Sequence, residues 1–431
     1  MRLPKPETLG DYFDLQRGTT YKSSLKGFAG PILLGLASIE RNGGFRQDKL
    51  TTYGGDSPEK LLVRPGELFV SLKDVTQAGD LLGAVARVPP TVPVGRLTQD
   101  TVKLVPTRTN PPLAYLYWLL RTPEVRGLCR SRATGTTNLG LAREDFLSIP
   151  VPVMTDERAR IVELLEAIEE RLMLHGDTNR TLEAMAQALF KSWFIDFDGH
   201  DDLVESEIGL VPRGWAVVPL AQTGRWISGG TPSKQNDAYW GGSIPWFSAK
   251  SLGPLWLTDS DDRLTEAGAD AGTRRVPRRS VLFIVRGMSL ATEWRIGMTT
   301  REATLNQDLK AIVDDGTVLP ELTLMWLLGN REIIRAKADE AGHGTKRLPT
   351  EVLHAHALAV PPRPQQERMA APLVNLLARI EQNLAECTSL AALRDALLPK
   401  LISGELRVPE ADEQVEEALK TIPPAAERRH A

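Results

Sequence analysis

Residues 161–193, IVELLEAIEERLMLHGDTNRTLEAMAQALFKSW, decide the fold. Apolar residues recur in this stretch at alternating steps of four and three, which is the heptad pattern of a coiled-coil helix. A second stretch, 373–401, carries the same kind of pattern with a change of register near Cys387. We predict two long antiparallel helices that meet along a seam made of Ile161, Leu165, Ile168, Leu172, Leu182, Leu189, Trp193, Leu373, Leu377, Ile380, Leu384, Leu397 and Leu401.

Two polar residues, His175 and Asn179, fall on this seam. A polar seam residue can fix the register of a coiled coil or contact a partner. A long seam can also tolerate a polar pair near a bend or an exposed gap, and we favour this second interpretation.

The chain repeats itself once, at an offset of 208–214 residues. Leu97–Asp100 (LTQD) recurs as Leu305–Asp308 (LNQD), and Tyr117–Leu120 (YWLL) recurs as Met325–Leu328 (MWLL). Short β-rich runs punctuated by Gly and Pro precede the helical stretches in both halves. The sequence therefore predicts an α+β fold with two pseudo-repeated mixed α/β lobes, each followed by one long helix.

These patterns define six segments. They are a first lobe (1–155), a central helix (156–200), a linker (201–212), a second lobe (213–364), a C-terminal helix (365–404) and a tail (405–431), for which we expect a short helix or disorder. Charge follows the same division. The lobes hold 20 basic against 14 acidic residues and 19 against 16, whereas 156–212 holds 5 against 14 and 365–431 holds 8 against 11. Two separate basic lobes suggest two anion-facing surfaces.

Several classes of protein are excluded by composition. Only two cysteines occur in 431 residues, so a disulfide scaffold is not expected, and a reducing cytoplasm fits. The sequence has no apolar run long enough to cross a membrane and no signal-peptide pattern at its start.

Recognisable catalytic motifs are missing. The sequence has no Gly-x-x-x-x-Gly-Lys-Ser/Thr loop, no Gly-x-Gly-x-x-Gly loop and no Gly-x-Ser-x-Gly elbow. Asn110–Leu113 (NPPL) resembles the Asn-Pro-Pro-aromatic motif of amino-methyltransferases, but Leu cannot stack on an extruded base, so we predict a helix start there. His354 and His356 lack a third ligand nearby in sequence, and the acidic run 194–202 fits a polar linker. We predict no catalytic residue, no metal site and no cofactor bound by this chain.

Two further clusters have open interpretations. The tryptophans of the second lobe could stack on bases, but we assign them first to core packing: Trp215, Trp226, Trp240, Trp246 and Trp256. The basic run Arg274–Arg279 (RRVPRR) could grip phosphates or form a solvated turn, and the sequence does not decide between these.

Several short motifs are shared with a known family. They are Pro212–Trp215 (PRGW), Gly229–Ser233 (GGTPS), Ile244–Trp246 (IPW), Leu305–Asp308, Val360–Pro362 running into Gln366–Arg368, Ala188–Phe194 (ALFKSWF) and Leu397–Gly404 (LLPKLISG). With these motifs, nearly the whole chain resembles the specificity subunits of type I restriction–modification enzymes. The first half lacks the Pro-x-Gly-Trp entry and starts at Leu3-Pro4, so the start of its lobe is open.

The resemblance implies two target-recognition domains held apart by the two helices, which would act as a ruler between two half-sites about one helical turn (~34 Å) apart. It implies double-stranded DNA as partner, read at an asymmetric bipartite site. It also implies two methyltransferase subunits, which carry S-adenosylmethionine, and two restriction/translocase subunits, which use ATP and Mg²⁺. The subunit itself would be non-catalytic and cytoplasmic, with no membrane contact.

With this resemblance, polar or basic residues in Gly-rich loops at matched positions of the two halves are the predicted DNA contacts. In the first lobe they are Arg17, Thr20, Lys22, Ser71, Lys73, Thr136, Thr137 and Asn138. In the second lobe they are Thr231, Ser233, Lys234, Lys250, Arg286, Ser289, His343, Thr345 and Lys346.

Two competing hypotheses stay open at this point. The chain could be a coiled-coil interaction scaffold that does not bind DNA, and a salt-sensitive shift with duplex DNA would separate the two readings. It could also be a nuclease or methyltransferase acting alone, which activity of the isolated chain would reveal.

Overall fold

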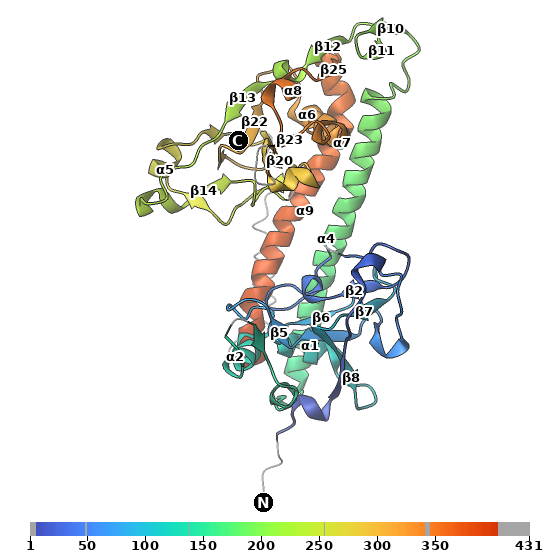
Figure 1. Cartoon of the computed structure of the whole chain (residues 1–431), viewed down its shortest axis with the longest axis vertical. Helices are drawn as coiled ribbons and strands as arrows, with labels where there is room; N and C mark the ends of the chain where they lie inside the picture. The colour runs from blue at the N-terminus through green and yellow to red at the C-terminus, as the bar shows by residue number, and fades with distance from the viewer. Residues whose placement is uncertain (1–5, 48–49, 137, 254, 341–344, 404–431) are drawn as a thin grey trace, which may run out of the picture. The chain divides into compact units, whose positions relative to one another are not determined.

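The computed structural model describes residues 6–47, 50–136, 138–253, 255–340 and 345–403. Within the described residues the chain divides into two compact units: residues 6–174 together with 386–403, and residues 175–385. The two long helices, α4 (Asp156–Phe194) and α9 (Arg363–Ser403), therefore contribute one part to each unit (Figure 1). No helix in the described ranges is both long and apolar enough to cross a membrane.

The lobe of the first unit is built on two small sheets. One has the order β1-β8-β4-β6, the second β2-β7-β3, and β5 pairs with β9. Three helices follow in the second half of the lobe. The bounds are β1 (Phe13–Arg17), β2 (Ile32–Leu34), β3 (Leu62–Val63), β4 (Leu68–Ser71), β5 (Lys73–Asp74), β6 (Val85–Arg87), β7 (Gly95–Leu97), β8 (Thr101–Pro106), α1 (Leu113–Arg121), α2 (Pro123–Ser131), β9 (Leu139–Gly140) and α3 (Arg143–Leu147).

The lobe of the second unit has the sheets β13-β22-β18-β20-β15, β16-β14-β21-β17 and β19-β24-β23, with β10 paired to β11 and β12 paired to β25. The bounds are β10 (Leu203–Ser206), β11 (Gly209–Pro212), β12 (Ala216–Pro219), β13 (Arg225–Ser228), β14 (Trp240–Phe247), β15 (Trp256–Leu257), β16 (Arg263–Leu264), α5 (Glu266–Asp270), β17 (Arg275–Val276), β18 (Val281–Ile284), β19 (Arg286–Gly287), β20 (Ile296–Thr299), β21 (Ala303–Leu305), β22 (Leu309–Val313), α6 (Pro320–Gly329), α7 (Arg331–Arg335), β23 (Asp339–Glu340), β24 (Lys346–Arg347), α8 (Thr350–His354) and β25 (Ala357–Val360).

The two lobes share one topology, so the internal repeat is confirmed. The order β1-β8-β4-β6 of the first lobe corresponds to β13-β22-β18-β20 of the second. The sheet β2-β7-β3 corresponds to β14-β21-β17, with one parallel and one antiparallel pairing in each. Helices α1, α2 and α3 correspond in order to α6, α7 and α8. As predicted, the run NPPL leads into a helix, because α1 begins at Leu113.

The predicted seam residues pack inside their own units. In the first unit Ile161 and Leu165 of α4 share a core with Leu397 of α9. In the second unit Leu373, Leu377 and Ile380 share a core with the end of α4. Ile168 is also buried, whereas the remaining seam side chains are half-buried: Leu172, Leu182, Leu189, Trp193 and Leu384. The side chain of Leu401 lies outside the described residues.

The polar seam residues are buried, which contradicts the exposed gap that the sequence analysis offered as one explanation for them. His175 is 5% exposed and Asn179 is 7% exposed. The fully buried Asn383 of α9 donates from Nδ2 to Oδ1 of Asn179 at 2.7 Å. A buried side-chain hydrogen bond between two helices forms at one alignment only, so this contact is of the kind that can fix the register of a coiled coil.

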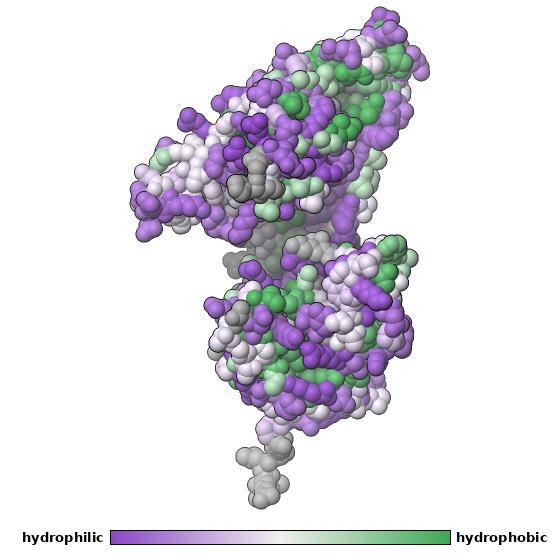
Figure 2. All heavy atoms as spheres, viewed as in Figure 1, coloured by the Kyte–Doolittle hydropathy of each residue, from purple (hydrophilic) through white to green (hydrophobic). Residues whose placement is uncertain are grey.

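Helix α4 ends at Phe194, before the predicted end at residue 200. The amides of Ile195 and Asp196 both donate to the carbonyl of Lys191. Phe197 then adopts a positive φ of 58°, and this left-handed backbone conformation prevents the right-handed helix from continuing. The predicted linker 201–212 forms the β10–β11 hairpin. Three apolar side chains of this hairpin are exposed: Leu203, Ile208 and Leu210. The face of the molecule drawn in Figure 2 is otherwise mostly hydrophilic.

The predicted tail 405–431 lies outside the described residues.

Candidate nucleic-acid interface

A short strand pair marks an equivalent edge in each lobe. In the first lobe β5 pairs with β9, and in the second β19 pairs with β24. The amide of Leu141 donates to the carbonyl of Leu72 just as Leu348 donates to Val285. This register makes Lys73 equivalent to Arg286, so the fold places one basic side chain at the start of the same strand in both lobes.

At the edge of the first lobe, Lys73 is half-exposed and pairs with an acidic neighbour. Its Nζ lies 3.6 Å from Oδ1 of Asp100. A surface cavity of about 410 Å³ opens here between β5, the turn before β8 and the 134–140 loop, and Lys73 and Asn138 line it. Thr136 is exposed on the same loop, and its carbonyl accepts from Gln77. The fold thus brings two predicted contact residues, Lys73 and Asn138, to one hollow, with Thr136 on the loop that borders it.

Arg17, the last residue of β1, and Thr20 and Lys22 of the loop that follows are three more predicted contacts, and all three are exposed. A buried arginine, Arg96, holds this loop in place. It is 4% exposed and donates to Oγ1 of Thr19 and to the carbonyl of Thr20. Sequence reasoning missed Arg96 as a positioning residue, although an arginine in a short apolar strand was a usable signal.

At the edge of the second lobe the basic residue has no acidic partner. Arg286 is exposed, and among the described residues nothing forms a hydrogen bond or an ion pair with its side chain. The equivalent of Asp100, Asp308, accepts instead from Nδ2 of Asn306 at 3.1 Å. Arg347 lies directly opposite Arg286 across the ladder. Like charges that face each other across a strand pair repel, and an anion bound between them relieves the repulsion.

Arg347 was missed by sequence reasoning, although its neighbours Thr345 and Lys346 were named; both of these are half-buried. Strand β23 brings Asp339 opposite Arg347 and Glu340 opposite Lys346. Arg286 is therefore the residue of this small sheet that has only a like charge across from it.

The other predicted contacts of the second lobe are spread over its loops. Thr231 donates from Oγ1 to Oε1 of Gln307 at 2.7 Å. The Nζ of Lys234 lies 5.7 Å and 5.8 Å from the ring centres of Trp240 and Trp246. Ser233 and Lys250 are exposed, whereas the Oγ of Ser289 is buried and has no partner in the described part of the chain.

The structure contradicts one predicted contact, Ser71. Its side chain is fully buried, and its hydroxyl donates to the carbonyl of Lys73 and accepts from the amide of Lys73. It shapes the turn that presents Lys73 and cannot reach a ligand itself. Thr137 and His343 lie outside the described residues. The remaining contacts stay predictions.

The basic run of the second lobe is occupied by carboxylates. Arg275 bonds Glu266, Asp270 and Glu302. Arg278 pairs with Glu381 of α9 at 2.7 Å, and Arg279 pairs with Glu321 of α6. Three of its four arginines therefore stabilise the fold, and only the exposed Arg274 is left for a ligand.

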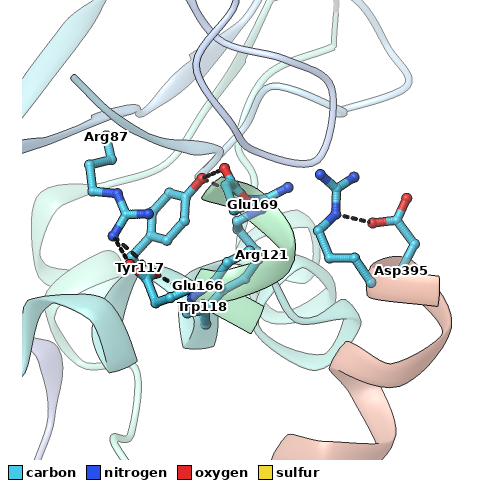
Figure 3. A network of polar contacts seen from close by, with 8 residues as sticks. Arg87, Tyr117, Trp118, Arg121, Glu166, Glu169 and Asp395 are labelled. Carbon is cyan, nitrogen blue, oxygen red and sulfur yellow. Dashed lines mark hydrogen bonds and ion pairs between the residues drawn. The ribbon is translucent and has the colours of Figure 1, made fainter. Parts of the chain in front are cut away.

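A polar network docks the first lobe on α4 within its own unit (Figure 3). Arg87 donates to both oxygens of Glu166, which also accepts from the indole of Trp118 at 2.7 Å. Arg121, 8% exposed, and Tyr117 both donate to Glu169. Burial raises the pKa of the Tyr117 phenol, so the hydroxyl stays protonated and remains a donor.

The remaining sequence clusters have structural roles. Trp215, Trp246 and Trp256 are buried, in agreement with core packing. His354 packs against Trp226, and His356 contacts Nζ of Lys337 at 3.0 Å. Burial, and then the charge of Lys337, lower the pKa of His356. No group of three metal-ligating side chains gathers anywhere in the described ranges.

Comparisons with known proteins now bear on this geometry. A specificity subunit of the type I restriction enzyme HindI from Haemophilus influenzae is 24% identical, over 60% of this chain and 69% of its own length. The MjaIX specificity subunit from Methanocaldococcus jannaschii is 26% identical, over 69% of each. The chain is thus related to the specificity subunits of type I restriction enzymes. The resemblance found in the sequence is confirmed.

The fold agrees with this relationship. The crystal structure of a type I restriction–modification S subunit from M. genitalium superposes with a TM-score of 0.54, at 16% identity, and covers 92% of this chain and 95% of that one. At this identity the match speaks for the fold alone, and it spans both lobes and both helices. No family model matches the chain.

Proposed function

We propose that the chain is the DNA-recognition subunit of a type I restriction–modification complex, and that each lobe reads one half of an asymmetric bipartite site. The observation that carries this proposal is the equivalence of Lys73 and Arg286. One topology presents a basic side chain at the same edge twice, in two different surroundings. Two similar frames with different surface residues suit two different half-sites.

The two edges would bind DNA by different means. Arg286 is exposed and unpaired among the described residues, and its planar fork matches the O6 and N7 acceptors of guanine in the major groove. Lys73 shares its charge with Asp100, so we assign it to a phosphate. The helices α4 and α9 would set the distance between the half-sites.

The chemistry would belong to partners. In this proposal two methyltransferase subunits bring S-adenosylmethionine, and two restriction/translocase subunits use ATP and Mg²⁺ in the cytoplasm. The chain itself would hold no cofactor and carry no catalytic residue.

The decisive experiment is single-molecule methylation sequencing of the host genome with the gene intact, deleted, and restored as wild type or as Arg286→Ala. We expect deletion to abolish adenine methylation at one split motif, two short blocks around a fixed gap, and wild type to restore it. Arg286→Ala should lower methylation at that motif. If deletion changes nothing, co-purification with a methyltransferase distinguishes a silent system from an absent recognition role.

A scaffold that does not bind DNA is tested separately. The purified chain should shift a duplex of the methylated motif, and the affinity should fall steeply with salt. A chain that binds its partner subunits but no duplex at low salt would support the scaffold instead.

A further inference from the structure

A second basic hollow lies in the first unit, between the 40–44 loop, helix α2 and the end of α9. It is a surface cavity of about 380 Å³, large enough for a small ligand group. Two acidic residues, Glu40 and Asp395, line it together with five arginines, Arg41, Arg121, Arg126, Arg130 and Arg394.

Three of these arginines have carboxylate neighbours. Arg121 pairs with Glu169 at 2.9 Å, Arg394 bonds Asp395 at 2.8 Å, and Arg41 lies 4.0 Å from Asp80. The positive charge of each of these three arginines therefore has a carboxylate nearby within the protein. The two arginines of α2 remain.

Arg126 is a buried cation without a carboxylate partner. It is 2% exposed, and its Nη atoms donate to the carbonyls of Leu82 and Asp80, which are neutral acceptors. Its Nε is buried and has no hydrogen-bond partner in the described part of the chain. Burial lowers the pKa of Arg126 to about 10, and the charges of Asp80 and Asp74 oppose this only in part.

Arg130 lies one turn further along α2 and is exposed. Its side chain makes no hydrogen bond or ion pair with the residues that the structure describes. Arg130 and Leu139 of β9 both approach Gly79, so this cavity neighbours the edge that carries Lys73.

The second lobe shows that the fold does not need this buried charge. Helix α7 begins at Arg331 where α2 begins at Pro123, after the matched tryptophans Trp118 and Trp326. The same offset makes Arg126 equivalent to Ile334, which is fully buried. An aliphatic side chain fills this position in one lobe, whereas a cation is held there against its desolvation cost in the other.

We infer that the cavity around Arg126 and Arg130 binds a phosphate group. The buried Arg126 would supply a positive charge at the base of the cavity, and the exposed Arg130, one turn further along the same helix, would donate hydrogen bonds to the phosphate from the solvent side. The phosphate would come from the backbone of bound DNA or from a small soluble phosphate compound. The inference does not depend on the DNA-recognition proposal, because the site is measured first without DNA.

The test uses the full-length chain with inorganic phosphate and pyrophosphate as probes. We expect saturable binding by calorimetry and a rise in the unfolding temperature in wild type. Arg130→Gln, an exposed change that leaves the core intact, should weaken binding about tenfold, the loss expected for a charge-assisted hydrogen bond. Arg126→Met should abolish binding. Arg160→Gln, an exposed arginine of α4 in the same unit that does not line the cavity, is the matched control.

The source of the phosphate follows from a second arm with duplex DNA. If Arg130→Gln lowers affinity for DNA and reduces the salt slope by about one, the phosphate belongs to the DNA backbone. If affinity for DNA is unchanged while pyrophosphate binding falls, the source is a soluble compound. The inference is overturned if wild type binds neither probe, or if Arg130→Gln and Arg160→Gln bind both probes as well as wild type does.

Discussion

The two lobes share a topology and differ in how their charges are used. In the first lobe Lys73 lies 3.6 Å from Asp100, whereas in the second lobe Asp308 is bonded by Asn306 and Arg286 remains unpaired among the described residues. The same topology therefore carries a basic residue paired with an acidic neighbour in the first lobe and an unpaired basic residue in the second. The partner of Asp308, Asn306, corresponds to Thr98 in the first lobe.

The contacts between each lobe and its long helix also combine a shared residue with a different partner. Glu169 of α4 and Glu381 of α9 occupy matched positions in the repeat. Glu169 accepts from Arg121 and Tyr117 of α1, whereas Glu381 accepts from Arg278 in the turn between β17 and β18. The carboxylate on the helix is common to both units, and the donor comes from a different element in each.

The largest expected effect comes from removing the carboxylate by which each long helix binds its lobe. Glu169→Ala leaves the buried Arg121 without its carboxylate and should lower the free energy of unfolding by about 3–5 kcal/mol. Glu381→Ala should lower it by about 1 kcal/mol, because the Arg278 side chain is 35% exposed and water replaces the pair. Urea denaturation of both variants, with Glu169→Gln as control, measures the difference. Equal losses would contradict the contrast drawn between the two units.

A second effect concerns the helix seam of the second unit. Asn179→Leu removes the acceptor of the fully buried Asn383 amide and should lower the free energy of unfolding by about 1–3 kcal/mol. Asn179→Leu with Asn383→Leu should recover the loss, because two apolar residues leave no buried polar group unsatisfied. Thermal unfolding of the single and double variants checks this, and a double variant as unstable as the single one speaks against a register device.

A third effect sharpens the comparison of the two edges. Arg286→Ala should weaken binding to the methylated motif by about 1–3 kcal/mol and relax the preference at one base pair. Lys73→Ala should weaken binding less and equally for all sequences, since Asp100 already shares its charge. Titration of wild type and both variants against specific and scrambled duplexes measures this. A sequence-specific loss from Lys73→Ala would reverse the roles assigned to the two edges.

The smallest effect is a pH dependence confined to the second lobe. Burial and the charge of Lys337 lower the pKa of His356, so the unfolded chain binds a proton there more readily than the folded chain does. Stability should therefore fall as the pH drops through the ordinary histidine range near 6.5. Lys337→Gln removes one cause of the shift and should flatten this dependence. Identical pH profiles of wild type and Lys337→Gln, followed by thermal unfolding, would exclude the contact as a cause.

Part of the interface could be predicted from the sequence. Contact with DNA stays a prediction for every named residue, but repeat matching named Lys73 and Asn138 in the first lobe and Arg286 and Thr345 in the second, and within each lobe these residues lie on or beside one short strand pair. It failed at Ser71, whose hydroxyl is consumed by the turn beside it, and at Arg347, whose position opposite Arg286 depends on strand register. Register is a long-range property, and loop composition does not encode it.

The amino-acid sequence alone determined the two long helices, the duplicated lobe and the family, because heptad periodicity and a constant repeat offset are visible along one chain. Only the tertiary structure decided which charged side chains form ion pairs within the protein. Arg278 and Arg279 look like free cations in sequence and are paired in the fold, whereas Arg126 is buried without a carboxylate. A charge is neutralised by neighbours in space, and for these residues the neighbours lie about 40 to 100 positions away along the chain.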